Sequence, residues 1–147
     1  MKFHPNGTSL ASGSDDKRIK VFDLRSNRLT QNLNNKSQVW SIAFDPAGLY
    51  ILAASNDGKI RVHDLRKGKV LKALHGHNLE CYSVTFSRLG DYFCSGGSDK
   101  KITLWKSNFP DRSTTLLHYL DATGMNRLLG TNECQALYEL MFGDDWN

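Results

Sequence analysis

Three residue types that support nucleophilic catalysis occur together in the second half of this chain: His77, Ser95 and Asp99. In a Ser-His-Asp triad the histidine takes the serine proton, and the aspartate orients the histidine ring. However, Asp16 and Asp57 precede Asp99 at nearly equal intervals, and neither of these earlier copies has the full set of partners. The pattern therefore favours a structural role for these side chains, and no enzyme activity is predicted.

Metal and redox chemistry are also poorly supported. His75 and His77 flank a single glycine, but no cluster of carboxylates or cysteines stands beside them to complete a metal site. The cysteines are Cys81, Cys94 and Cys134, an odd number without Cys-x-x-Cys spacing. This usage argues against a disulfide framework or a zinc site and favours a reducing compartment. No glycine-rich phosphate loop occurs, so no cofactor or metal is predicted.

Length and charge limit the classes of protein further. The chain has 147 residues, of which 39% are hydrophobic, and no apolar run approaches the ~20 residues of a membrane helix. We therefore expect no membrane association and, without an apolar leader at the start, no signal peptide. Lys and Arg outnumber Asp and Glu by 17 to 9 over residues 1–110, but fall short by 2 to 6 over residues 111–147. This asymmetry predicts a change of structural role near residue 110.

Internal repeats provide the strongest signal. Phe3-His-Pro-Asn-Gly7 recurs as Phe44-Asp-Pro-Ala-Gly48 and again as Phe86-Ser-Arg-Leu-Gly90, at nearly equal intervals. The three aspartates keep this register, and so do three aromatic or imidazole residues: Phe22, His63 and Trp105. A repeat of ~40–45 residues is typical of β-propeller blades with four strands each.

Each repeat contains strand and turn signals at the same places. Residues 19–22, 60–63 and 102–105 alternate in the period of a strand, and acidic or polar turn residues precede each segment. The His4–Gly7 and Asp45–Gly48 segments have proline second and glycine fourth, which favours a type I turn. The sequence therefore predicts an all-β fold.

With these repeats, the chain resembles the WD40-repeat β-propeller superfamily over residues 1–109. The Gly-His pair of that superfamily corresponds to Gly76-His77, and its Trp-Asp pair to Phe22-Asp23, His63-Asp64 and Trp105-Lys106. The segments Leu74–His77, Phe86–Asp99 and Trp105–Phe109 resemble the closing repeat of the centriolar WD40 proteins, the proteome-of-centriole family.

The resemblance implies a structural hydrogen-bonded tetrad of His77, Ser95, Asp99 and Trp105, with Ser98 as an alternative serine. In such a tetrad every buried polar side chain would have a hydrogen-bond partner. In the second repeat Ala53 replaces the serine and His63 replaces the tryptophan. In the first repeat Phe22 has no N–H donor, although Ser12 and Asp16 remain. We therefore expect the first two blades to be held more by packing than by polar links.

The expected fold is a partial WD40 propeller of about three blades with a short C-terminal helix. The repeats occupy residues 1–110, with blades near 1–35, 36–76 and 77–120; the outer strand of the third falls between 113 and 120. Residues 121–147 form a tail whose apolar spacing predicts a helix over 133–142. Closed propellers typically have ~4–8 blades. The chain is therefore expected either to be part of a longer product or to close the propeller by self-association.

The resemblance implies a non-catalytic protein-interaction scaffold in centriole or basal-body integrity and cilium assembly, located in the cytoplasm, cytoskeleton and centriole. The alternative is an adaptor subunit of a ubiquitin-ligase, chromatin or RNA-processing complex. Protein partners are expected, nucleic acid is not, and microtubules or tubulin are one candidate. Turns of successive blades would gather a basic interaction rim from six residues: Arg25, Arg28, Arg66, Lys67, Lys69 and Lys106. Such a rim would attract polyanions such as the microtubule surface in a salt-dependent way.

Overall fold

The computed structural model describes residues 1–107, 109 and 115–121, and these residues form three antiparallel sheets of four strands. The first sheet contains β1 (Lys2–Phe3), β2 (Ser9–Gly13), β3 (Arg18–Asp23) and β4 (Arg28–Asn34). The second contains β5 (Val39–Phe44), β6 (Tyr50–Ser55), β7 (Lys59–Asp64) and β8 (Lys69–His75). The third contains β9 (Cys81–Phe86), β10 (Tyr92–Gly97), β11 (Lys101–Lys106) and β12 (Thr115–Asp121).

Strands follow one another in space as they do in the sequence, so each sheet is a meander. The turn after the first strand of each sheet has the same geometry in all three repeats. The amide of Gly7 donates to His4 O at 2.8 Å, Gly48 to Asp45 O at 2.9 Å, and Gly90 to Ser87 O at 3.0 Å. All three glycines have φ between 71° and 83°, a region that L side chains rarely adopt. The repeated glycine therefore fixes this turn.

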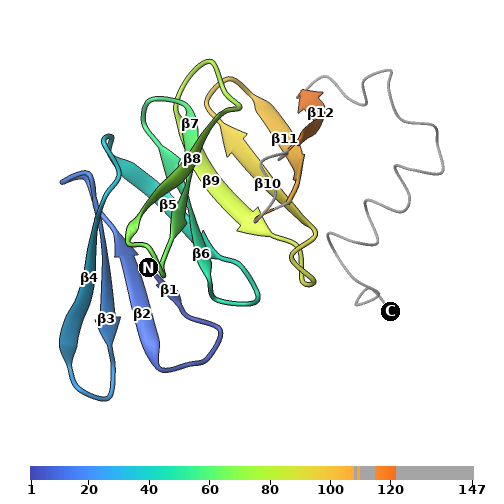
Figure 1. Cartoon of the computed structure of the whole chain (residues 1–147). Coiled ribbons are helices and arrows are strands. Elements are labelled where there is room, and N and C mark those ends of the chain that lie inside the picture. Colours follow the sequence, from blue (N-terminus) through green and yellow to red (C-terminus); the bar gives the residue numbers. More distant parts are fainter. Residues whose placement is uncertain (108, 110–114, 122–147) are drawn as a thin grey trace, which may run out of the picture.

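The sheets stack face to face like the blades of a fan (Figure 1). Between the first and second sheets, Ala11, Ile19 and Val21 pack against Ile42 and Ile51. A second cluster joins the other two sheets and includes Leu52, Ile60, Val62, Val84, Phe93 and Trp105. Because the second sheet is covered on both faces, every residue of β6 is buried. This is the all-β propeller architecture that the repeats predict.

The predicted helix over residues 133–142 lies outside the described residues. Within the described part of the chain, no helix is long and apolar enough to cross a membrane.

Candidate functional site

The residues of the predicted tetrad meet between the second and third sheets. His77 comes from the loop that joins β8 to β9, Ser95 from β10, Asp99 from the turn after β10, and Trp105 from β11. His77 Nδ1 lies 2.9 Å from Asp99 Oδ1, and His77 Nε2 lies 2.9 Å from Ser95 Oγ. The indole Nε1 of Trp105 donates to Ser95 Oγ at 3.2 Å. The structure therefore brings all four side chains into one hydrogen-bonded chain.

The order of donors and acceptors in this series of hydrogen bonds follows from the two side chains at its ends. Trp105 Nε1–H can only donate and the Asp99 carboxylate can only accept, so Ser95 donates to His77 Nε2 and His77 Nδ1–H donates to Asp99. Burial by itself would raise the pKa of Asp99, but hydrogen bonds from His77 and from the amides of Asn78 and Lys101 hold it below its usual value.

The same contacts leave Ser95 little scope as a nucleophile. Its side chain is buried, with 2% of the residue exposed, and its oxygen already accepts the Trp105 indole proton. A substrate carbonyl would have to displace that indole from the core between two sheets. The arrangement is suited to joining a loop, a turn and two strands rather than to acyl transfer.

A second buried network, which sequence reasoning missed, lies between the first and second sheets. Asn35, in the loop after β4, occupies the position that His77 holds in the following repeat. Its Nδ2 donates to Ser55 Oγ and to Ser37 O, both at 2.9 Å, so its Oδ1 must accept from His63 Nε2 at 2.9 Å. Asn35, Ser55 and His63 are each fully buried. Asn35 and Ser55 therefore give the second blade polar links that the sequence did not lead us to expect, although hydrophobic clusters also cover both faces of this sheet.

This second network is incomplete at one atom. The other ring nitrogen of His63, Nδ1, is buried without a hydrogen-bond partner among the described residues. Burial of the ring, with a smaller effect from the nearby Arg61 guanidinium, lowers the pKa of His63 to about 4. His63 is therefore a neutral donor in the folded protein at neutral pH.

The turn aspartates of the first two repeats have different partners from Asp99. Arg61 donates to Asp57, with Nη1 at 3.0 Å from Oδ1, and Lys20 Nζ lies 3.0 Å from Asp16 Oδ2. Both basic residues stand four positions after their aspartate, where the third repeat has Thr103. A cation in the next strand thus replaces the loop histidine as the partner of the carboxylate.

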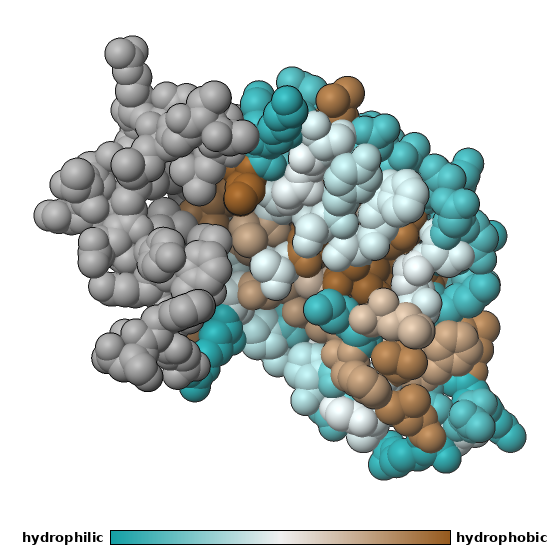
Figure 2. All heavy atoms as spheres, turned by 180° about the vertical axis from the view of Figure 1, so that it is seen from behind, coloured by the Kyte–Doolittle hydropathy of each residue, from teal (hydrophilic) through white to brown (hydrophobic). Residues whose placement is uncertain are grey.

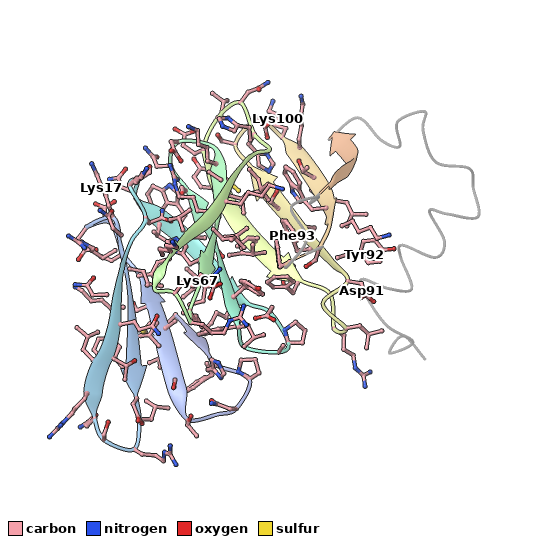
Figure 3. All side chains as sticks on the ribbon, viewed as in Figure 1. Lys17, Lys67, Asp91, Tyr92, Phe93 and Lys100 are labelled. Carbon is pink, nitrogen blue, oxygen red and sulfur yellow. The ribbon has the colours of Figure 1, made fainter. Side chains whose placement is uncertain are left out.

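The six residues of the basic rim are all exposed and lie in or beside the turns at one end of the strands. Figure 3 shows Lys67 and Asp91 toward this end, and Lys17 and Lys100 at the other. Arg66 and Lys67 share the carboxylate of Asp64, at 3.5 Å and 4.0 Å, while that side chain is only 2% exposed. Cations therefore dominate the outer surface of this turn.

An exposed aromatic pair is a further feature that the sequence analysis did not single out. Trp40 and Tyr82 occupy matching positions in β5 and β9, and each is skipped in the pairing register with the neighbouring strand. Such β-bulges re-aim a side chain. Both residues are 51% exposed, and their rings meet edge to face with centroids 6.0 Å apart. The sequence signal that could have revealed this pair is that the two aromatic residues stand at equivalent positions in successive repeats.

No group of three potential metal ligands occurs among the described residues. Cys81 is buried, and burial raises the pKa of its thiol to about 12, so the thiolate is scarce at neutral pH.

Stacked four-stranded meanders with buried polar links define the class of repeat β-propeller proteins. A family model described as the anaphase-promoting complex subunit 4 WD40 domain matches residues 1–89, which is more than half of the chain. The chain therefore belongs to the WD40-repeat family. The solved "Structure of U3-55K" has the same fold, with a TM-score of 0.74 and 17% identity over 82% of this chain and 38% of that one.

Three curated relatives have sequence similarity over most of this chain. Pre-mRNA-processing factor 19 of Homo sapiens is 44% identical over 126 residues, covering 84% of this chain and 24% of that protein. Guanine nucleotide-binding protein subunit beta-5b of Danio rerio is 34% identical, covering 71% and 27%. THO complex subunit 3 of Arabidopsis thaliana is 26% identical, covering 71% and 33%. The chain thus spans a third or less of the length of these relatives.

These relatives correct the expected location. A pre-mRNA-processing factor and a THO complex subunit point away from the centriole and the cytoskeleton, so the centriolar location that the resemblance implied is wrong. The comparisons support the WD40 family, and they do not support its centriolar branch or a tubulin partner.

Proposed function

We propose that this chain is a non-catalytic interaction scaffold in a pre-mRNA-processing assembly, and that it works in the nucleus, where pre-mRNA is processed. The observation that carries the proposal is its 44% identity to pre-mRNA-processing factor 19 over 126 residues. The similarity to a THO complex subunit adds support. The RNA-processing adaptor is thereby favoured over the centriolar role.

The basic rim is the surface that we assign to an acidic protein partner. Its six side chains are exposed in or beside the turns, and two of the nearby carboxylates are occupied with local contacts. Asp23 accepts the amides of Arg25 and Ser26, and Asp64 accepts those of Arg66 and Lys67. Such a field accelerates association with an opposite charge and is screened beyond ~8 Å at physiological salt.

The Trp40–Tyr82 pair is a second contact surface. Trp and Tyr are enriched among residues that dominate binding energy at protein interfaces. The Trp40 indole Nε1 donates to Asn56 Oδ1 at 3.4 Å, which helps to hold this ring in place before a partner arrives.

The proposal can be tested by expressing the tagged chain in cells, imaging it and measuring how much unspliced pre-mRNA it co-precipitates after crosslinking. We expect nuclear signal and enrichment of unspliced over spliced RNA. A triple variant of the basic rim, Arg25→Glu, Arg66→Glu and Lys69→Glu, should reduce that enrichment. The matched control, Lys17→Glu, Lys36→Glu and Lys100→Glu, makes the same charge change at exposed positions outside the rim. Exclusion from the nucleus, or no enrichment of unspliced RNA with the wild-type chain, would contradict the proposal.

A further inference from the structure

One face of every sheet carries a row of side chains at equivalent positions, and the residues of each row are paired across neighbouring strands. The row is Phe44, Ile51, His63 and Val70 in the second sheet, and Phe86, Phe93 and Trp105 in the third. In the first sheet the equivalent row is Phe3, Leu10, Phe22 and Leu29. Residues directly opposite each other in antiparallel strands project from the same face, so we call this the front face of each sheet.

The front faces of the second and third sheets are covered by the sheet before them. Ile51 is 0% exposed and Phe93 is 1% exposed, each inside a cluster shared with the preceding sheet. In the first sheet, by contrast, Phe3 is 68% exposed and Leu29 is 48% exposed. Figure 2 shows hydrophobic side chains gathered over the end of the molecule that carries this sheet.

An ion pair shows the same difference in exposure between the first and second sheets. The Arg61–Asp57 pair belongs to the second sheet, and the Arg61 side chain is 6% exposed. Its equivalent in the first sheet, Lys20–Asp16, has a Lys20 side chain that is 38% exposed. The front face of the first sheet therefore repeats that of the second in its apolar row and in its ion pair, but no other described part of the chain covers it.

The opposite face of the third sheet, which we call its back face, is the complementary surface. Ile19 and Ile60 are 0% exposed on the back faces of the first two sheets, where the next sheet covers them. Ile102, at the same position in the third sheet, is 45% exposed. A Cβ added at Gly96, which aligns with the buried Ala54, would meet no atom of the described residues within 4 Å.

We propose that a second copy of this chain covers both surfaces, with the front face of the first sheet in each copy packed on the back face of the third sheet in the other. The contact would continue the packing already present between the three sheets, since it joins the same two kinds of face. A head-to-tail contact makes a closed ring when the rotation returns to the start. Two copies supply six sheets, within the ~4–8 of closed propellers.

The experiment measures the mass of the full chain in solution by sedimentation velocity. The wild-type chain should sediment with twice the 16.6 kDa of one copy. A front-face variant, Phe3→Asp with Leu29→Asp, and a back-face variant, Ile102→Asp, should each lose most of the dimer. The control, Leu71→Asp with Leu89→Asp, changes side chains that are 44% and 74% exposed away from both faces, and should remain dimeric.

Mixing the two variants tests whether the contact is head to tail. Cooperative thermal unfolding confirms that each variant is folded. Front-face and back-face variants retain one complementary surface each, so an equimolar mixture should recover a mixed dimer. A monomeric wild type would overturn the proposal, as would a control that dissociates equally. If Ile102→Asp stays dimeric, the front faces pair with each other and the head-to-tail arrangement is wrong.

Discussion

Trp105 and His63 hold the same position in consecutive sheets, and each donates a ring N–H to a buried acceptor. Trp105 reaches Ser95 Oγ, and His63 reaches Asn35 Oδ1. The indole has one polar atom and satisfies it, whereas the imidazole has two and leaves Nδ1 unpaired among the described residues. At the level of single residues, the hydrogen-bonding groups at this position are therefore better satisfied in the third sheet than in the second.

Trp105 contributes through both its ring and its N–H, and two substitutions separate these contributions. The ring stacks on Phe93, with centroids 5.7 Å apart and planes 7° from parallel. Trp105→Ala should lower the free energy of unfolding by about 3–5 kcal/mol, because a large buried ring is lost. Trp105→Phe keeps a stacking ring but removes the donor to Ser95, and should cost about 1–3 kcal/mol. Denaturant unfolding measures both values.

The expected ranking also compares the two sheets. His63→Ala removes a smaller ring and one hydrogen bond, so it should cost less than Trp105→Ala. Equal losses for these two alanine variants would argue against a special role for the tetrad.

His63 should make stability depend on pH in mildly acidic solution. Its pKa is about 4 in the folded chain against a usual value of 6.5, so the unfolded chain binds more protons between these limits. The free energy of unfolding should therefore fall as pH decreases through this window, by up to about 1.4 kcal/mol per pH unit.

His63→Gln retains a donor without a titrating ring, and its stability should vary less between pH 6.5 and pH 4.5. Urea unfolding of both proteins across this range provides the measurement. Parallel pH profiles for the two proteins would show that His63 is not the group responsible. The window is kept above pH 4.5 because carboxylates with lowered pKa values, such as Asp99, destabilise the fold mainly at lower pH.

Among the elements, the loop from Gly76 to Glu80 joins the second sheet to the third by lying on the turn after β6. The amide of His77 donates to Gly58 O at 3.3 Å. A Cβ at Gly58 would stand 2.6 Å from His77 O and 2.5 Å from Leu79 O, and its φ of 72° is already unfavourable for other residues. This close approach places His77 over the third sheet.

Gly58→Ala and Gly68→Ala form a matched pair that separates backbone strain from this contact. Gly68 has a φ of 62°, but an added Cβ there would meet no atom of the part of the chain that the structure describes within 4 Å. Gly68→Ala should cost about 1–2 kcal/mol, from the left-handed conformation alone. Gly58→Ala should cost about 2–4 kcal/mol, since the loop must also move. Thermal unfolding of the two variants tests the difference, and equal shifts in Tm would show that the loop does not rest on Gly58.

For the molecule as a unit, the basic rim predicts salt-sensitive binding to an acidic polypeptide. Polyglutamate is a suitable probe, because it offers charge without stacking bases. We expect binding at low salt that weakens steeply as salt increases, and a much smaller salt effect for Arg25→Glu, Arg66→Glu and Lys69→Glu. Fluorescence anisotropy of labelled polyglutamate reports both. Unchanged binding by this variant, with its fold intact, would remove the rim as the contact surface.

Much of the fold was predictable because the repeat places the same residue types at the same strand positions. Phe3, Phe44 and Phe86 mark successive first strands, and the glycine four residues after each one adopts the left-handed conformation that closes the turn. His77, Ser95, Asp99 and Trp105 could be named in advance, since the family resemblance specifies them one by one. The location could not, because the resemblance to one branch of a large family says little about where a scaffold works.

The amino-acid sequence was sufficient to specify the strands, the turns and the order of the sheets, because these depend on local alternation and on residues with special φ. Apart from the tetrad that the resemblance specified, which side chains meet across elements became clear only from the packing of the sheets. Asn35 faces His63 because a loop after one sheet folds onto the next, and this contact depends on how the sheets stack. Trp40 and Tyr82 meet because bulges in two strands turn both rings outward. The same alternation supplies Ile19, Ile60 and Ile102, yet stacking alone buries the first two and leaves the third exposed.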